Sequence, residues 1–371
     1  METSRKLITR VGFEVLALIC LGAGFVIMHK KVEPFQRGFY CDDENIKKPF
    51  KEDTVSEMLC FVIWAFLAAA ILIPVEMVSF ISHPTINTTE VKVPTLEKKI
   101  PALVVELYRI IGSFTIGGVF CMFATEMCKI TIGELRPHFL TLCNIDLTKD
   151  LCECTSNVCD GEYHVYVEDF NCTFKSEVSG VKFEGEAVWN KKVKDAKKSF
   201  LSGHSAFSFY CAVYLTLYLG TRLINLKTKE KFIGQQRSGT FMLLILKALR
   251  PFIQFGLLAT AFYICLSRVS DYKHHPRDVI AGGLFGSLSA YLTITYIANL
   301  ANKPRLVYND FDQLDGKQVK KNGLDQLDGK EDMKESEIIT LESVTIDQST
   351  DLQTEGKVAD AVALYENQCP N

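Results

Sequence analysis

The chain lacks an excess of positive charge, and this absence argues against one large class of function. Its 371 residues include 41 Lys and Arg against 44 Asp and Glu, a formal net charge of −3. A protein that binds nucleic acid needs a basic surface to neutralise phosphates, so we expect no nucleic-acid partner. A wholly disordered chain is also excluded, because 48% of the residues are hydrophobic and disordered chains have few such residues.

Two further absences argue against a metal site among the 13 cysteines and against a cleaved signal peptide at the N-terminus. The string CECTSNVC at 152–159 could suggest a metal site, but the paired CxxC motifs of soft-metal sites are missing. No small-residue cleavage site follows the first apolar run, where Lys30 and Lys31 stand instead. We therefore expect no metal and no cleaved signal peptide.

Charge divides the chain into a body, residues 1–301, and a tail, residues 302–371. The tail holds 8 Lys and Arg against 15 Asp and Glu, and the body 33 against 29, so their net charges are −7 and +4. The tail has no hydrophobic periodicity and repeats DQLDGK at 312–317 and 325–330. We predict an acidic, disordered tail in the cytosol, in which the repeat is either a solvated linker, the favoured reading, or a duplicated partner motif.

The apolar residues of the body lie in six long runs separated by polar loops. A helix needs about 20 mostly apolar residues to cross the hydrocarbon core. The sequence therefore predicts an all-α membrane protein with six spans, at residues 11–29, 56–81, 101–127, 203–221, 243–266 and 279–300. Glu106 and Arg109 fall inside the third run at i and i+3, where an ion pair is the favoured reading over a functional role.

The loops set the expected orientation. Five basic residues follow the fourth run between 222 and 237, which favours the cytosol, although the first loop also has several lysines. The loop between runs three and four has five cysteines, typical of an oxidising compartment, and the sequon Asn171, Cys172, Thr173. We expect Asn171 to be glycosylated, the sequon at Asn87 to be unused, and both termini to be cytosolic. With Cys41, six cysteines face outside, and the sequence does not choose their pairing.

Three polar clusters stand at the ends of the predicted spans, all on the outer side by the parity of the spans. They are residues 129–137 (KITIGELRP), 199–205 (SFLSGHS) and 267–278 (SRVSDYKHHPRD). The clusters supply Lys129, Arg136 and Arg268, cations whose donors match phosphate oxygens. Ser202 and Gly203 open a predicted helix, whose free N–H groups can bind an anion. Each motif alone is weak, but their order and shared side predict a phosphate site without a metal.

Two histidines then divide the acid–base chemistry. A neutral imidazole can attack phosphorus, and a carboxylate on its other nitrogen orients it. His274 and Asp278 lie at i and i+4, within reach if a helix begins there. His275, at i and i+3 from Asp278, is the local alternative, although the spacing from Arg268 favours His274. His204 can protonate the leaving oxygen and then deprotonate water.

The three clusters match the motifs K-x6-RP, PSGH and SR-x5-H-x3-D, so the chain resembles the type 2 phosphatidic acid phosphatase superfamily, and within it the animal lipid phosphate phosphatases. The resemblance covers the clusters at 129–278 and the layout over about 1–300; Leu201 replaces the proline of the second motif. It implies phosphate binding by Lys129, Arg136, Ser202, Gly203 and Arg268. It also implies a nucleophile at His274, an acid–base role for His204 and an orienting Asp278.

The resemblance further implies which substrates and which compartment to expect. The substrates are phosphatidate, lysophosphatidate, sphingosine 1-phosphate and ceramide 1-phosphate, hydrolysed without a metal through a phosphohistidine. The site faces the extracellular or lumenal side, with the plasma membrane as the expected location, and a homo-oligomer is compatible with the sequence. Two alternatives stay open: a non-catalytic membrane scaffold, which would have lost motif residues, and a phosphotransferase that moves a lipid headgroup to an alcohol.

Overall fold

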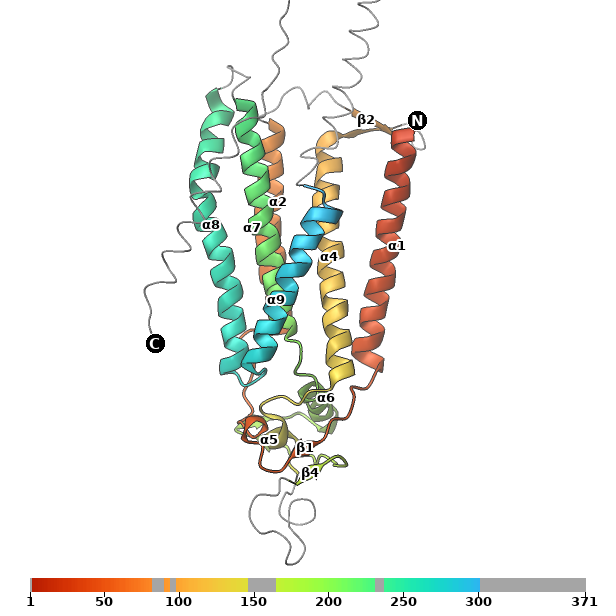
Figure 1. The fold of residues 1–371 in the computed structure, drawn as a ribbon, viewed down its shortest axis with the longest axis vertical. Helices are drawn as coiled ribbons and strands as arrows, with labels where there is room; N and C mark the ends of the chain where they lie inside the picture. Colours follow the sequence, from red (N-terminus) through yellow and green to blue (C-terminus); the bar gives the residue numbers. More distant parts are fainter. Residues whose placement is uncertain (1, 82–89, 94–97, 146–164, 231–236, 301–371) are drawn as a thin grey trace, which may run out of the picture. The chain divides into compact units, whose positions relative to one another are not determined.

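The computed structural model describes residues 2–81, 90–93, 98–145, 165–230 and 237–300. Six long helices dominate it (Figure 1): α1 (Glu2–Lys31), α2 (Glu57–Ile81), α4 (Ala102–Ile132), α7 (Gly203–Glu230), α8 (Arg237–Ser270) and α9 (Pro276–Leu292), which continues into the π-helical turn η2 (Thr293–Ile297). The shorter elements are the 3-10 turn η1 (Glu44–Ile46) and the helices α5 (Phe139–Cys143) and α6 (Glu186–Ala196). The mainly helical fold class is confirmed.

The strands form three small antiparallel pairs. They are β1 (Phe39–Tyr40) with β4 (Tyr166–Val167), β2 (Glu90–Val93) with β3 (Lys98–Pro101), and β5 (Glu177–Val178) with β6 (Val181–Lys182). In the first pair Phe39 lies opposite Val167. This pair therefore joins the first loop to the third, two segments far apart in the sequence.

Five of the described helices are long and apolar enough to cross a membrane: Val11–Lys31, Glu57–Phe80, Leu103–Ile132, Leu244–Ser270 and Pro276–Ile297. Each overlaps one of the predicted spans. The fourth predicted span, 203–221, lies in α7, which is not among the five. The chain is a multi-pass membrane protein by these helices, and the sixth span stays a prediction.

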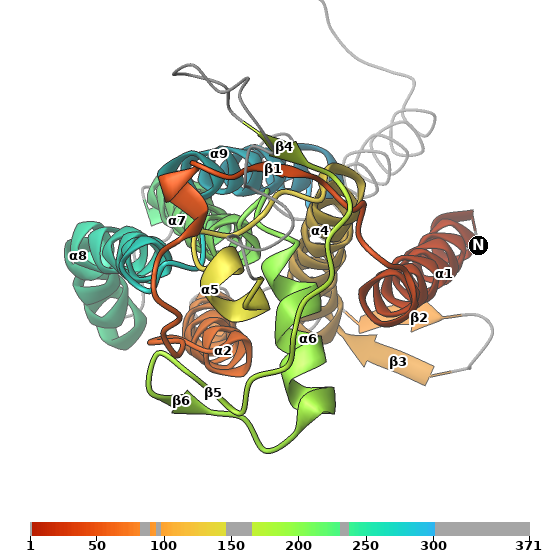
Figure 2. The same cartoon turned by 90° about the horizontal axis from the view of Figure 1, so that it is seen from below.

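The position of α7 explains its weaker apolar character. It packs against α2, α4, α8 and α9, so it lies at the centre of the bundle, whereas α1 packs against α4 at the edge (Figures 1 and 2). Tyr210, Tyr214 and Tyr218 recur every fourth residue along one face of α7 and are fully buried. Their hydroxyls bond to α4 and α2, at 2.7 Å from Tyr210 to the Phe114 carbonyl and 2.7 Å from Tyr218 to Glu76. A helix that faces protein can carry such polar groups because each one has a partner.

A glycine brings α9 against the start of α7. A Cβ on Gly286 would overlap the carbonyl oxygen of Ala206 on α7, so a side chain there would force the two helices apart. Asp278 lies eight residues earlier and Gly282 four, which places all three on one face of α9. The close contact at Gly286 therefore also presses Asp278 against the residues that precede α7.

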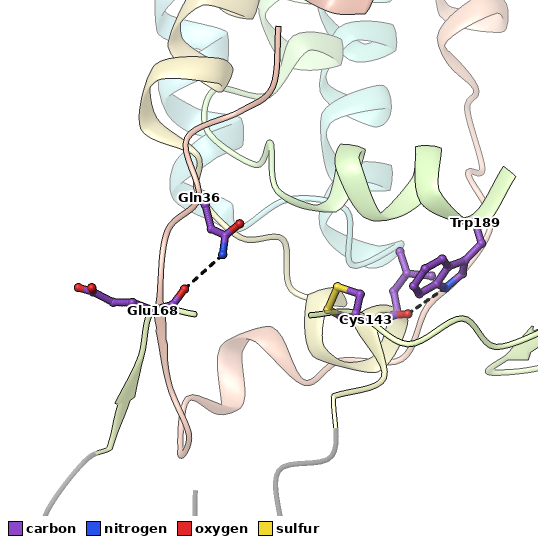
Figure 3. Close-up of a disulfide and its surroundings, with 6 residues drawn as sticks. Gln36, Cys143, Glu168 and Trp189 are labelled. Carbon is purple, nitrogen blue, oxygen red and sulfur yellow. Dashed lines mark hydrogen bonds between the residues drawn. A yellow bond between two sulfur atoms is a disulfide. The ribbon is translucent and has the colours of Figure 1, made fainter. Parts of the chain in front are cut away.

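A separate apolar core lies beyond one end of the helices, built from the first and third loops. Its fully buried members include Phe139 and Leu142 of α5, and Trp189 of α6 is 2% exposed. Trp189 Nε1 donates to the Leu142 carbonyl at 3.1 Å, and Gln36 Nε2 donates to the Glu168 carbonyl at 3.3 Å (Figure 3). We call this core, with the loops that form it, the cap.

One disulfide of the cap joins Cys143 to Cys172 (Figure 3). Cys41 is also disulfide-bonded. The other cysteines of the third loop, 152, 154 and 159, lie outside the described residues, as do the sequon at Asn87 and the tail from 302. The side chain of Asn171 is exposed, and its glycosylation stays a prediction.

The predicted ion pair of Glu106 and Arg109 is present, at 2.8 Å, and belongs to a larger network. Arg222 of α7 reaches Glu106 at 3.1 Å and Glu76 of α2 at 2.9 Å. All four side chains are buried. The network supports the structural reading of Glu106 and Arg109, since it joins α2, α4 and α7 inside the bundle.

Candidate active site

The three polar clusters converge at the capped end of the helices. The first and second are joined by the N–H of Ser199, which donates to the Glu134 carbonyl at 2.8 Å, and the N–H of Arg136 donates at 2.9 Å to the carbonyl of Ala196, which ends α6. The second and third are joined by Ser202, whose N–H donates to the Asp278 carbonyl at 3.2 Å. The predicted site residues are therefore brought together by direct contacts, although their chemical roles stay predictions.

The first cluster changes direction at Gly133. This residue ends α4 with a φ of 58°, and its N–H donates to the Lys129 carbonyl at 3.1 Å. Glycine adopts this left-handed conformation without steric penalty. Lys129 thus stays on the last turn of α4. It lies close to the start of α7, because a Cβ added to Gly203 would be 3.1 Å from the Lys129 Nζ. Arg136 follows the change of direction and comes back toward α6.

Arg136 is buried and pairs with a carboxylate from the cap. Its Nη2 donates to Asp195 Oδ1 of α6 at 3.0 Å, while its Nε is buried without a hydrogen-bond partner in the described part of the chain. Burial raises the pKa of Asp195, but the charges of Arg136 and Lys129 outweigh it and hold that pKa well below its usual value. Asp195 is therefore an anion beside two predicted phosphate ligands.

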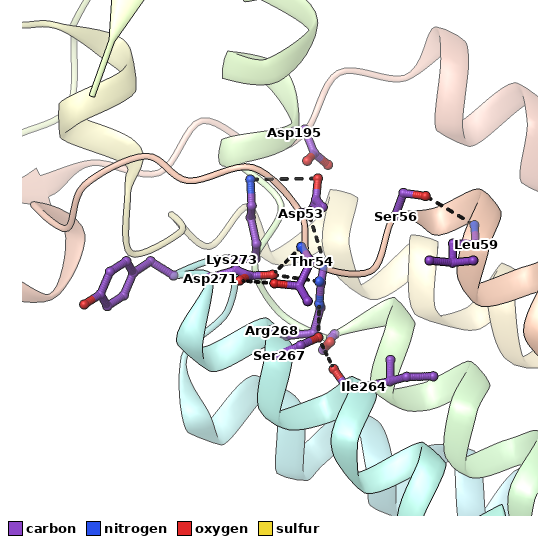
Figure 4. A network of polar contacts seen from close by, with 12 residues as sticks. Asp53, Thr54, Ser56, Leu59, Asp195, Ile264, Ser267, Arg268, Asp271 and Lys273 are labelled. Atoms are coloured by element: carbon purple, nitrogen blue, oxygen red, sulfur yellow. Dashed lines mark hydrogen bonds and ion pairs between the residues drawn. The ribbon is translucent and has the colours of Figure 1, made fainter. Parts of the chain in front are cut away.

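Arg268 at the end of α8 is 1% exposed and makes three polar contacts (Figure 4). Its Nη1 donates to Asp53 Oδ1 at 2.8 Å and its Nη2 to Asp271 Oδ2 at 2.9 Å, while Nε donates to Ser267 Oγ at 3.2 Å. Asp53 belongs to the first loop, so the cap reaches directly into the predicted phosphate site.

Asp278 lies at the start of α9, with both predicted histidines near it. His274 Nδ1 is 3.8 Å from Asp278 Oδ2, too long for a hydrogen bond. The same oxygen accepts from Ser199 Oγ at 2.5 Å and from the His275 N–H at 3.0 Å, and His275 Nδ1 is 3.3 Å away. His275 therefore caps α9 and is the closer of the two rings. His274 and Asp278 lie close together, as the spacing predicts, but no hydrogen bond joins them.

Unpaired polar atoms occur in all three clusters. Arg136 Nε, His204 Nε2, His274 Nδ1 and Asp278 Oδ1 are all buried, and none has a hydrogen-bond partner among the described residues. The His204 ring lies within electrostatic range of Arg268, His274 and Lys129. Buried polar groups are almost always paired in proteins, so unpaired atoms on residues of all three clusters indicate a site prepared for a polar ligand.

The ionisation of the third cluster suits nucleophilic chemistry. Burial lowers the pKa of His274 to about 4; Asp278 opposes the shift, and the charges of Arg136 and Lys129 favour it. The ring is therefore neutral at pH 7, the form in which an imidazole attacks. Burial likewise lowers the pKa of Lys273 to about 8, although Asp53 opposes the shift, so most of this amine is still charged at pH 7.

Sequence reasoning gave no role to four residues of the site. Asp195 reaches it from a part of the chain that carries no recognisable motif. Asp53 belongs to the first-loop string FYCDDENIKKPFKEDTV, which resembles the animal lipid phosphate phosphatases but assigned this aspartate no role. Lys273 stands inside the third cluster, beside His274, and its type and position could have marked it as a further cation. The side chain of Ser199 was also given no role, although its hydroxyl holds Asp278.

Among the described residues, one group of side chains could hold a metal by distance alone. Glu134, His275 and Asp278 each offer one ligand atom, and these atoms lie within 4.8 Å of one another. The carboxylates already have partners, since Glu134 contacts Arg277 and Asp278 contacts Ser199. A cation there would have to displace these contacts, so the donor set does not favour a metal.

Comparison with known proteins agrees with these motifs. The PAP2 superfamily matches residues 108–301, just over half of the chain, and this match contains all three clusters. Phospholipid phosphatase 1 of Mus musculus is 34% identical over 305 residues, which cover 78% of this chain and 86% of that protein. Phospholipid phosphatase 2 of Homo sapiens is 30% identical over 286 residues, covering 77% and 82%. No solved structure matches the chain significantly.

Proposed function

The chain belongs to the PAP2 superfamily and is an enzyme of the phosphatidate and phospholipid phosphatase kind, and from this premise we propose that it hydrolyses lipid phosphomonoesters through a phosphohistidine at His274. Buried polar atoms without hydrogen-bond partners among the described residues, on Arg136, His204 and His274 of the three joined clusters, carry the proposal. The substrates we propose are phosphatidate, lysophosphatidate, sphingosine 1-phosphate and ceramide 1-phosphate, which share a phosphomonoester on an apolar tail.

In the first step, the His274 ring attacks phosphorus while the bond from phosphorus to the lipid oxygen breaks. His274 Nδ1 is on the side of Asp278, which leaves Nε2 to form the new bond. A protonated His204 gives its proton to the departing lipid oxygen, so that a neutral alcohol leaves. Asp278 stabilises the positive charge that develops on the His274 ring.

In the second step, water attacks the phosphohistidine. His204, now neutral, accepts a proton from the water as its oxygen bonds to phosphorus, and the bond from His274 to phosphorus breaks. Inorganic phosphate and the starting enzyme result. The negative charge is stabilised by Lys129, Arg136 and Arg268, fixed cations whose positions need no rearrangement during the reaction. Because these side chains supply positive charge, we propose that activity is independent of metal and persists in excess EDTA.

We further propose that α7, which holds the fourth predicted span, crosses the membrane together with the five apolar helices, so that the chain has six spans. Both termini would then be in the cytosol, and the site would be at the outer face of the plasma membrane or in a lumen. Supporting this orientation, the disulfide of Cys143 and Cys172 and the exposed Asn171 belong to the cap beside the site. A glycosidase should increase the electrophoretic mobility of the wild type but not of Asn171→Gln. A mobility change that persists in Asn171→Gln would contradict this topology.

The test of the activity is a phosphate-release panel with the four lipid phosphates, comparing the wild type with His274→Ala. We expect release by the wild type and none by His274→Ala, because the variant has no nucleophile. His275→Ala tests the local alternative, because it removes the other ring beside Asp278; it should lower activity less than His274→Ala. Equal rates for His274→Ala and the wild type would reject the nucleophile, and release of lipid headgroup to an alcohol instead of water would favour a phosphotransferase.

A further inference from the structure

Two carboxylates bind the buried guanidinium of Arg268, so a phosphate that binds this arginine competes with them. Asp53 binds Nη1 and Asp271 binds Nη2, at 2.8 and 2.9 Å, and Ser267 accepts from Nε. The side chain of Arg268 is 1% exposed. Three of the five N–H groups of the guanidinium thus have partners, and because the side chain is almost fully buried, a substrate gains access to the others only where a partner moves away.

The two carboxylates differ in how firmly they are held. Asp271 also accepts hydrogen bonds from the N–H and the hydroxyl of Thr54, at 2.8 and 2.7 Å, and its side chain is 9% exposed. Asp53 is 29% exposed and lies in the loop before α2, and the ion pairs of its carboxylate join it to Arg268 and Lys273 (Figure 4). Asp53 is therefore the partner that can leave while Asp271 keeps Arg268 in place.

Lys273 is a buried cation held by weak contacts. Its Nζ lies 3.9 Å from Asp53 Oδ2 and 4.4 Å from the centre of the Phe50 ring. The first distance is longer than a hydrogen bond, although a buried ammonium is stabilised best by a close anion. A phosphate oxygen between Lys273 and Arg268 would supply this close anion. Lys273 is also next to the proposed nucleophile, because it directly precedes His274 in the sequence.

On the basis of the proposed phosphatase function, we propose that Lys273 is a further phosphate-binding residue. In the free enzyme, the carboxylate of Asp53 occupies the position that the substrate phosphate takes when it binds. A phosphomonoester dianion displaces Asp53 from Arg268 and Lys273, since it brings two negative charges where the carboxylate has one. Asp53 thus holds the two cations in position before substrate binds and weakens the binding of any anion that competes with it.

Equilibrium binding of inorganic phosphate to the full-length protein in detergent micelles tests this proposal. Asp53→Asn should bind phosphate about fivefold more tightly, because the competing charge is gone. Lys273→Met should bind it about tenfold more weakly, and Lys273→Arg should recover most of the affinity. The matched control is Glu52→Gln, which removes the same charge from the same loop at an exposed position and should leave the affinity within about twofold of the wild type.

Weaker phosphate binding by Asp53→Asn, at an unchanged thermal midpoint, would show that Asp53 only positions Arg268 and would overturn the displacement. Unchanged affinity in Lys273→Met would overturn the role of Lys273. Phosphate release from phosphatidate, measured on the same samples, separates this proposal from the proposed function. The expected affinity shifts without any release would reject the phosphatase and support this inference, while normal release with no affinity shifts would reject this inference alone.

Discussion

Ser199 offers a sharp test of how the site holds Asp278. Its hydroxyl donates a 2.5 Å hydrogen bond to Asp278 Oδ2, and both side chains are fully buried. A hydrogen bond to a charged group contributes about 1.5–3 kcal/mol. If that energy keeps the carboxylate toward His274 in the transition state, Ser199→Ala should lower kcat by about 10- to 150-fold.

The assay is steady-state phosphate release from a water-soluble lysophosphatidate, which gives kcat and KM separately. KM should change little, because Ser199 orients Asp278 and is not a proposed phosphate ligand. Ser199→Thr keeps the hydroxyl and should recover much of kcat. Ser208→Ala is the matched control, since it also removes a buried serine hydroxyl from a hydrogen bond, at 3.0 Å to Trp64, but away from Asp278.

Two results would refute this reasoning. Wild-type kcat in Ser199→Ala would show that His275, which also donates to Asp278 Oδ2, is enough to hold the carboxylate. An equal loss of activity in Ser208→Ala would show that any buried serine hydroxyl matters through stability alone. Thermal unfolding midpoints of both variants, measured in the same detergent, separate the second result from a true effect on the site.

Three other predictions follow from contacts away from Ser199. The pKa of Lys273 is lowered to about 8, so its amine loses charge as pH rises through that value. Phosphate affinity should therefore fall above pH 8 in the wild type but not in Lys273→Arg. The same dependence of phosphate affinity on pH in both proteins would contradict the assignment. Cys143→Ser opens a disulfide that spans 29 residues, which should destabilise the cap by about 3–4 kcal/mol. Dithiothreitol, which also reduces the disulfide of Cys41 in both proteins, should remove most of the difference between their thermal midpoints, and a difference that persists would disprove this. Arg222→Met leaves Glu76 and Glu106 without their shared cation, which should destabilise the bundle by about 3–5 kcal/mol. The control Lys47→Met breaks an exposed ion pair with Glu44 and should destabilise the protein by at most about 1 kcal/mol. Equal thermal midpoints for the two variants would contradict this prediction.

The helical fold could be predicted because apolar length is a local property of the chain. Each of the five apolar helices overlaps a predicted run, since about 20 apolar residues specify a span without reference to the rest of the chain. The helix α7 shows the limit of this argument. Its tyrosines are satisfied by Phe114 and Glu76 on neighbouring helices, and such partners cannot be identified from the apolar run alone.

Motif spacing placed most of the candidate site but not its internal geometry. Lys129, Arg136, His204 and Arg268 stand at fixed distances along the sequence from their motif neighbours, so the clusters could be recognised. The spacing also suggested that His274 and Asp278 are within reach, and they are 3.8 Å apart. It did not indicate that Ser199 and His275 hold the same oxygen more closely, because those contacts depend on how α9 begins and on what precedes α7.

The sequence by itself determined which residues could carry the chemistry and that the chain is built of apolar helices. Both follow from residue type and from spacing over a few turns of helix. The tertiary structure alone brought carboxylates from distant parts of the chain to the predicted phosphate ligands. Asp53 meets Arg268 across 215 positions of the sequence, and Asp195 meets Arg136 across 59. Such pairs form only when the cap folds over the helix ends, because no local interaction connects residues so far apart in the chain.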